Sequence, residues 1–253
     1  MTQNVKNLLL SALACFGSCL PADAAELKLG GIFTDGAVLQ RNTPVPVWGV
    51  ANPGQSVQLT FGGQTKSGTA GADGRWTLTL APMAASAKPQ SLSVSGEGAT
   101  RSVQIDDVLI GEVWLCSGQS NMAMIVDRAR DHEREKADAD LPGLRVFTVQ
   151  RATSLNPLSD CSGAWVGSSP ETAGRFSAIA FFFGRELHRE LDVPIGLIVS
   201  AWSGSAIEAW TSREIQEKQR PLSDLLKTWR QKDAADTPEI ASEEKAEYER
   251  SFS

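Results

Sequence analysis

This sequence has few histidines and cysteines, and it has no excess of positive charge. Its 253 residues include 2 histidines and 4 cysteines, and the formal net charge is −6. This balance argues against a broad basic surface that would bind nucleic acid. No metal-ligand spacing, phosphate-binding glycine loop or dinucleotide-binding fingerprint occurs in the sequence, so it predicts neither a metal nor an organic cofactor.

Long hydrophobic runs are also absent. The apolar stretch at residues 8–16 is too short to span a bilayer of roughly 30 Å, so no stable membrane insertion is expected. It follows a lysine and precedes the small residues Ala-Asp-Ala at 22–24, a pattern typical of a cleaved export signal. We therefore expect residues 1–24 to be a signal peptide and the protein to be periplasmic or secreted. The alternatives are a buried N-terminal helix and a lipoprotein signal.

The cysteines divide between the expected signal and the mature chain. Cleavage would remove Cys15 and Cys19 and leave Cys116 and Cys161. Export permits disulfides, so these two could pair, but they could equally be small buried side chains.

Residues 25–105 have the pattern of an antiparallel β-sandwich, because short runs of apolar and β-branched residues alternate with turns that contain glycine. The runs lie at residues 45–50, 57–61, 76–80 and 92–94, and the turns at 52–54, 62–63, 72–74 and 96–98. No catalytic constellation is evident in this part.

Residues 106–211 alternate predicted strands with a predicted helix. Apolar stretches at 108–115, 145–149 and 194–199 predict strands, and apolar residues three and four apart predict a helix between residues 176 and 191. The apolar stripe of this helix consists of Phe176, Ile179, Phe183, Leu187 and Leu191. This order is typical of a parallel sheet, whose ligand site lies beyond the carboxyl ends of its strands.

Residues 212–253 predict a charged helical connector that ends abruptly. Pro221 suits the first turn of one helix, and Thr-Pro-Glu at residues 237–239 suits the start of another. The apolar stripe of the first helix consists of Leu222, Leu225, Leu226 and Trp229.

Ser120 is the candidate nucleophile. It follows a predicted strand and Gly118, where a helix should begin and where unpaired backbone N–H groups could stabilise a negative oxygen. A serine in that position suits acyl transfer, although a simple helix cap would have the same pattern. Met122 stands where a Gly-x-Ser-x-Gly elbow has its second glycine, so this turn is of another kind.

A second candidate loop follows the predicted strand at 194–199. Gly204 would let the backbone approach a ligand and could donate its N–H to an oxyanion, or it could be an ordinary turn glycine. Trp202 and Trp210 flank it and could stack on a sugar ring or fill the core. Both candidate loops follow strands of the predicted parallel sheet, so we expect them at the same edge.

A serine nucleophile requires a general base, and the sequence shows no clear one. His132 lies in a charged run, and His188 lies on the polar face of the predicted helix, so neither is near a predicted strand end. The carboxylates that could line a pocket, or simply lie on the surface, are Asp127, Asp131 and Glu208.

Residues 111–122 closely resemble the nucleophile block of the sialate O-acetylesterase family, within the SGNH (GDSL-like) hydrolase superfamily. Further resembling segments follow the family's order, at residues 33–41, 44–49, 73–76, 176–191 and 196–210. The resemblance implies an α/β protein in which the N-terminal antiparallel β-sandwich precedes a parallel three-layer α/β/α SGNH domain, incomplete within these residues.

The resemblance also implies a reaction. The family removes acetyl groups from sialic acids, and bacterial relatives act on other acetylated glycans, by hydrolysis through a serine acyl-enzyme without a cofactor. Ser120 matches the nucleophile, and Gly204 matches the glycine that binds the oxyanion together with the Ser120 N–H. The residues expected to contact the substrate are Gln119, Asn121, Trp202 and Ser205.

Two features depart from the family's pattern. Relatives tend to have Trp-Gly-Gly-Thr where residues 202–205 are Trp-Ser-Gly-Ser. The asparagine block and the Asp-x-x-His block that relatives carry downstream are absent from these 253 residues. We therefore expect the N-terminal portion of an esterase, with little turnover by this chain alone. The alternative functions are a non-catalytic carbohydrate-binding protein and an inactive truncated remnant.

Overall fold

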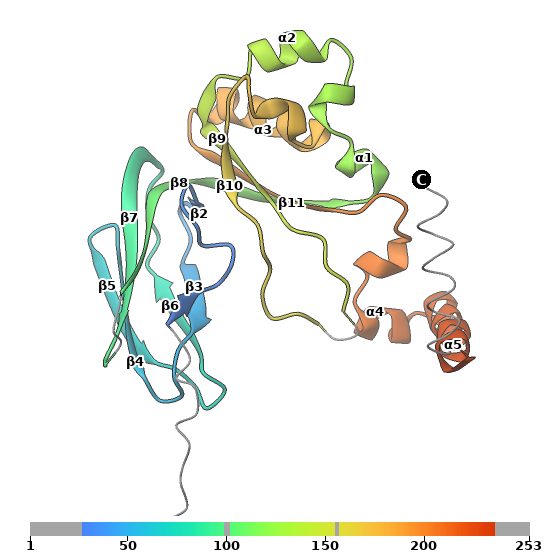
Figure 1. Ribbon diagram of the computed structural model, residues 1–253, viewed down its shortest axis with the longest axis horizontal. Coiled ribbons are helices and arrows are strands. Elements are labelled where there is room, and N and C mark those ends of the chain that lie inside the picture. The colour runs from blue at the N-terminus through green and yellow to red at the C-terminus, as the bar shows by residue number, and fades with distance from the viewer. Residues whose placement is uncertain (1–26, 99–101, 155–156, 236–253) are drawn as a thin grey trace, which may run out of the picture.

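The computed structural model describes residues 27–98, 102–154 and 157–235 (Figure 1). The expected signal peptide and the expected helix start at residues 237–239 lie outside these ranges. The described residues form two sheets, a group of helices beside the larger sheet, and two C-terminal helices set apart from it (Figure 1).

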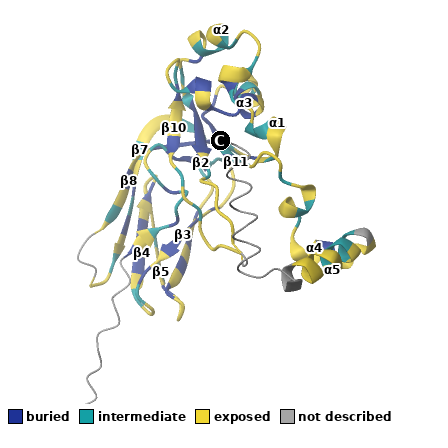
Figure 2. Ribbon diagram, turned by 45° about the vertical axis from the view of Figure 1, so that its right-hand side comes forward, coloured by how far each residue is buried: buried dark blue, intermediate teal, exposed yellow. Residues whose placement is uncertain are grey.

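The N-terminal strands enclose a hydrophobic core between the two sheets. Alternate residues of these strands are buried, as their sequence pattern predicts (Figure 2). The smaller sheet consists of β1 (Lys28–Leu29), β3 (Val45–Val50) and β6 (Arg75–Leu80). The antiparallel part of the larger sheet consists of β4 (Ser56–Phe61), β5 (Gln64–Thr69), β7 (Ser86–Gly96) and the first part of β8 (Val103–Gly118).

The four strands predicted in this region are confirmed, but β5 was not predicted. Its sequence, Gln-Thr-Lys-Ser-Gly-Thr, contains no apolar residue except glycine, because it lies at the edge of the sheet and pairs only with β4. An edge strand with one solvated face buries little, so it leaves no hydrophobic pattern to recognise.

Strand β8 runs through both parts of the larger sheet. Its residues 103–110 pair with β7 in antiparallel fashion, and its residues 112–118 pair with β11 (Ile195–Ala201) in parallel. The boundary expected between residues 105 and 106 therefore lies inside one continuous strand. Three further strands complete this sheet. Strand β2 (Val38–Gln40) runs parallel to β8, and β9 (Leu141–Thr148) runs parallel to β11. Strand β10 (Trp165–Ser168) pairs antiparallel with β9.

The mixed sheet and its helices confirm the α/β class. Three α-helices lie on one side of the parallel strands: α1 (Ser120–Ala123), α2 (His132–Ala137) and α3 (Ala178–Leu191) (Figure 1). The last two described helices, α4 (Arg213–Lys218) and α5 (Arg220–Ala235), pack chiefly against each other. Within the described ranges the three-layer arrangement is thus not seen.

Helix α3 buries a different face from the predicted one. Ile179 and Phe183 of the predicted apolar stripe are 45% and 41% exposed. The buried face includes Gly184, where an added Cβ would lie 2.6 Å from the Leu197 side chain of β11. The missing side chain lets the helix lie close to the sheet, and Phe183 packs against Trp114 at the edge instead, with ring centroids 5.2 Å apart.

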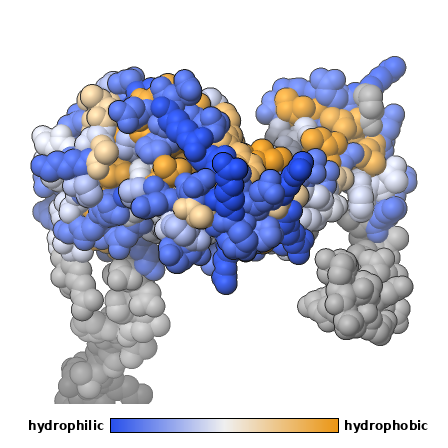
Figure 3. Space-filling view, turned by 90° about the horizontal axis from the view of Figure 1, so that it is seen from above, coloured by the Kyte–Doolittle hydropathy of each residue, from blue (hydrophilic) through white to orange (hydrophobic). Residues whose placement is uncertain are grey.

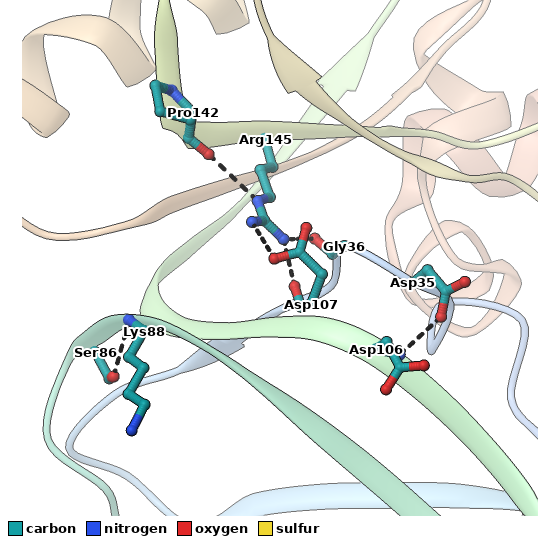
Figure 4. Close-up of polar contacts among 8 residues, drawn as sticks. All are labelled: Asp35, Gly36, Ser86, Lys88, Asp106, Asp107, Pro142 and Arg145. Atoms are coloured by element: carbon teal, nitrogen blue, oxygen red, sulfur yellow. Dashed lines mark hydrogen bonds and ion pairs between the residues drawn. The ribbon is translucent and has the colours of Figure 1, made fainter.

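Arg145 of β9 connects the parallel strands to an irregular part of β8 (Figure 4). Its side chain is 8% exposed, and its Nη1 donates to the carbonyl oxygens of Gly36, at 2.8 Å, and Asp107. Its Nη2 pairs with Asp107 Oδ1 at 2.9 Å, and its Nε donates to the Pro142 carbonyl at 3.4 Å. Asp107 has a φ of +59° beside a register shift between β7 and β8, so the guanidinium holds a bulge in place.

The neighbouring Asp106 fixes the other side of this bulge. Its N–H donates to Asp35 Oδ1 at 2.7 Å (Figure 4). Its carboxylate accepts hydrogen bonds from Ser91 and Gln104, which lower the pKa of Asp106. The loop before β2 and the strands β7 and β8 are thereby held together.

Glu112 forms a second partly buried ion pair on β8. Its Oε1 lies 2.6 Å from Arg41 Nε, and the two side chains are 21% and 23% exposed. The hydrogen bond from Arg41 holds the pKa of Glu112 below its ordinary value, although burial acts in the opposite direction. A carboxylate with a depressed pKa in the folded state adds stability above its unfolded pKa, and this is lost as pH falls through the folded pKa.

We therefore expect Glu112→Gln to lower the free energy of unfolding by about 1 kcal/mol at pH 7. The difference from the wild type should shrink as the pH falls through the lowered pKa of the wild-type carboxylate, below the ordinary range of a glutamate. Urea unfolding at pH 7, 5 and 3.5 would measure it. Glu190→Gln, at an exposed position of α3, is the matched control. A difference that does not change with pH would contradict the assignment.

Candidate active site

Ser120 begins α1, directly beyond the carboxyl end of β8. Gly118 has a φ of +145°, a conformation that side chains rarely allow, and it turns the chain toward the helix. Ser120 is exposed, so its hydroxyl is accessible from solvent. Helix α1 is only four residues long, so the helix-end field that the sequence suggested is weak.

Gln119 holds both reactive groups of Ser120. Its side-chain Oε1 accepts a hydrogen bond from the Ser120 N–H at 3.0 Å and another from the Ser120 hydroxyl at 2.9 Å. A ligand oxygen that is to bind the Ser120 N–H must therefore displace the Gln119 amide. Asn121, the other candidate beside the serine, lies exposed on α1.

The loop that contains Gly204 lies at the same edge of the sheet, as expected. The last residue of β11, Ala201, is in register with Gly118, and the Trp202 N–H donates to the Gly118 carbonyl at 3.0 Å. The turn before Ser120 and the loop that follows β11 are thus joined by a backbone hydrogen bond. The catalytic roles assigned to Ser120 and Gly204 stay predictions.

The loop requires glycine at position 204 because of the backbone conformation there, and not because a side chain would lack space. Its φ is +77°, and an added Cβ would meet no atom within 4 Å. Gly204→Ala should therefore destabilise this loop conformation by about 1–2 kcal/mol, whereas Gly204→Asn should be tolerated better, because asparagine adopts positive φ more readily.

Tryptophan fluorescence of the flanking indoles and hydrogen exchange of the loop would compare the two variants. Equal effects of alanine and asparagine would show that the conformation of Gly204 is not what the loop requires.

A hollow of about 1060 Å³ opens beside this loop. It is lined by the residues that follow β9 and by those that follow β11, among them Arg151, Asp160, Trp202 and Trp210. The Trp210 Nε1–H donates to Ser205 Oγ at 2.7 Å, and this hydroxyl donates to the Trp202 carbonyl at 2.7 Å. The Ser205 hydroxyl, predicted to contact the substrate, thus serves first to fix the loop between the two tryptophans.

Neither histidine hydrogen-bonds Ser120. His188 Nδ1 lies 2.8 Å from the Val193 carbonyl oxygen, near the C-terminal end of α3. His132 Nε2 lies 3.1 Å from Glu133 Oε1 on α2. Both side chains are therefore engaged locally, as their sequence context indicated.

The three carboxylates considered from the sequence do not line the hollow. Asp127 pairs with Lys136 at 3.0 Å, and Asp131 lies 3.8 Å from Arg130. The charged residues that do line it, Arg151 and Asp160, were missed. The position of Arg151, two residues beyond the strand predicted at 145–149, is the signal that would have found it.

Cys116 and Cys161 carry free thiols. Burial raises the pKa of both the Cys116 and Cys161 thiols, with the Asp160 charge contributing at Cys161, so both stay protonated at neutral pH. Over the described ranges, no cluster of three or more potential metal-ligating side chains is present. None of the described helices is long and apolar enough to cross a membrane.

Comparisons with known proteins relate this chain to acetylesterases. Residues 110–241 match the family described as carbohydrate esterase, sialic acid-specific acetylesterase. The sialate O-acetylesterases of Rattus norvegicus and Homo sapiens are 33% and 34% identical over 183 residues, which cover 66% of this chain and 34% and 35% of theirs. The crystal structure of a carbohydrate acetylesterase from Xanthomonas citri aligns with a TM-score of 0.72 and 38% identity, over 76% of this chain and 44% of that one. The chain thus spans about a third of the length of these curated relatives.

Proposed function

Because the chain belongs to the family of sialic acid-specific carbohydrate acetylesterases, we propose that it supplies the nucleophile and part of the oxyanion-binding site of a carbohydrate O-acetylesterase. The observation that carries this proposal is the 3.0 Å hydrogen bond from the Trp202 N–H to the Gly118 carbonyl. It brings the Ser120 turn and the Gly204 loop together at the carboxyl ends of two parallel strands, where α/β proteins bind ligands.

In the proposed reaction, Ser120 Oγ attacks the carbonyl carbon of the acetyl ester and loses its proton to a general base. The tetrahedral oxyanion accepts hydrogen bonds from the Ser120 and Gly204 N–H groups after the Gln119 amide has moved away. The bond between the carbonyl carbon and the sugar oxygen breaks, and this oxygen takes the proton from the protonated base and leaves as the sugar hydroxyl. Water then hydrolyses the acetyl-serine and releases acetate.

No residue in the described ranges that could act as a general base hydrogen-bonds Ser120, whose hydroxyl hydrogen-bonds only Gln119 there. We propose that an Asp/His pair from polypeptide outside this sequence supplies it and completes an SGNH-type α/β/α domain. The greater length of the curated relatives supports this. The 253-residue chain alone should then turn over substrate slowly, because a serine without a base is a weak nucleophile.

The proposed substrate is an acetylated sialic acid or another acetylated glycan. The hollow beside the Gly204 loop is large enough for a sugar, and Trp202 and Trp210 offer aromatic faces to a sugar ring. Gln119, Asn121 and Ser205 would contribute polar contacts close to the ester. We also propose a periplasmic or secreted location, on the sequence pattern of residues 1–24.

Release of acetate tests the proposal. The product of the whole reading frame that contains this sequence should be incubated with O-acetylated N-acetylneuraminic acid and with acetylated xylo-oligosaccharides. Free acetate from at least one of these is the expected result, and the 253-residue chain should be assayed alongside. Absence of acetate release from every acetylated sugar would reject the esterase function.

A further inference from the structure

Arg151 lies against an aromatic ring in the hollow. Its guanidinium carbon is 5.7 Å from the centroid of the Trp202 ring, within the range of a cation–π contact. The two residues come from the loops after β9 and β11, which are adjacent parallel strands. A guanidinium supported over a ring keeps its in-plane N–H donors available to a ligand.

The charged side chains that line the hollow are Arg151 and Asp160. Asp160, its acidic lining residue, accepts the Gly31 N–H at 2.8 Å and the Cys161 N–H at 2.9 Å through Oδ1. These backbone donors occupy Oδ1 and hold the carboxylate against the chain. Arg151 forms no ion pair with any acidic residue in the described part of the chain, so its charge is open to a ligand.

The aromatic rings beside Arg151 are held in place. Ser205 accepts the Trp210 indole N–H and donates to the Trp202 carbonyl, so one hydroxyl joins the parts of the loop that carry both rings. The Trp202 and Trp210 side chains, which are 37% and 36% exposed, therefore lie with the Arg151 guanidinium in the lining of the hollow of about 1060 Å³. Aromatic faces next to a guanidinium suit a ligand with an apolar ring face and a carboxylate.

We propose that Arg151 is a specificity-determining residue that binds the carboxylate of an acidic sugar, with the sugar ring against the neighbouring indoles. A planar guanidinium can bind a carboxylate through two parallel hydrogen bonds, which a neutral sugar cannot offer. The inference rests on the proposed function for the ligand being a sugar. It adds which residue distinguishes acidic from neutral acetylated glycans.

Binding of two matched ligands tests this inference without requiring hydrolysis. N-acetylneuraminic acid and its methyl ester differ in the carboxylate charge and have the same ring. Isothermal titration of the 253-residue chain should show that the acid binds about tenfold more tightly than the ester. Arg151→Met should weaken binding of the acid to the level of the ester and leave the ester unchanged, whereas Arg151→Lys should retain part of the preference.

Arg130→Met is the matched control, since it removes an arginine whose side chain is 95% exposed and does not line the hollow. It should keep the full preference for the acid. The inference is overturned if the wild type binds both ligands equally, if it binds neither, or if Arg151→Met keeps the preference.

The outcome separates this inference from the proposed function. A preference for the acid without any acetate release from acetylated sugars would reject the esterase and keep the role of Arg151. Acetate release without such a preference would do the reverse. In an active enzyme, Arg151→Met should raise KM for an acetylated acidic sugar more than KM for the methyl ester of the same sugar.

Discussion

Ser120→Ala is expected to lower kcat/KM for p-nitrophenyl acetate by roughly 10⁴-fold or more in the product of the whole reading frame, because no acyl-enzyme can form without the hydroxyl. The protein should fold as before, since Ser120 is exposed and, among the residues that the structure describes, its hydroxyl hydrogen-bonds only the neighbouring Gln119 side chain. Steady-state kinetics would measure the loss, and the thermal unfolding midpoint would verify the fold.

Ser117→Ala is the matched control for this substitution. Ser117 lies on β8, three residues before Ser120, and is also exposed. Its replacement should leave kcat/KM within about twofold, because surface substitutions away from a reactive group have small effects. Turnover that persists in Ser120→Ala, or that falls equally in both variants, would remove Ser120 from the reaction.

Arg145→Met should cause the largest loss of stability, about 2–4 kcal/mol in the free energy of unfolding. The substitution removes the donors to the Gly36 and Asp107 carbonyls and leaves these oxygens beside an apolar side chain. It also releases the irregular part of β8 from β9, so both parts of the shared sheet should be affected (Figure 4). Urea denaturation monitored by circular dichroism would measure it.

Asp107→Asn separates the ion pair from the backbone contacts in this cluster. Asparagine tolerates the φ of +59° at this position, and the Asp107 carboxylate is 52% exposed, so its charge is partly screened. We expect a loss of about 1 kcal/mol or less. A loss as large as that of Arg145→Met would mean that the charge, and not the carbonyl contacts, fixes the bulge.

The sequence predicted the elements that bury a regular apolar pattern. Strands β3, β4 and β6 lie within about one residue of their expected bounds, because alternate side chains enter the core. Strand β5 was missed, since it contributes little to the core. Helix α3 was expected, but the prediction of its buried face was wrong. The helix has apolar residues on more than one face, and the close approach of Gly184 to Leu197 decides which face packs on the sheet.

The sequence predicted the apolar stripe of α5 but not how much of it is covered. Hydrophobic side chains gather on the part of the molecule formed by α4 and α5 (Figure 3). Leu222, Leu225 and Leu226 of the predicted stripe are half-buried, but Trp229 is 52% exposed and lies under the Lys232 ammonium group, with 5.0 Å between the nitrogen and the ring centroid. A periodic stripe indicates which side chains share a face, and the neighbouring element decides how much of it is covered.

The candidate site follows a similar division. Strand ends are local features, so the sequence located Ser120 and Gly204 and placed them at one edge of the sheet. It did not show that Gln119 holds the Ser120 hydroxyl, or that Ser205 bridges two tryptophans, because such contacts depend on side-chain direction. The position of Arg151 beyond a predicted strand was a local signal, but its contact with Trp202 joins loops some fifty positions apart, which the sequence does not show.

The sequence by itself determined the class of fold, most strands, the family and the serine at the end of β8, since each depends on residues that are close together in the chain. The tertiary structure decided that β8 runs through both halves of the larger sheet, that Arg145 holds its bulge, and that Arg151 and not a histidine lies beside the Gly204 loop. The physical reason is that these features depend on strand register and on contacts between distant residues, for which no local pattern exists.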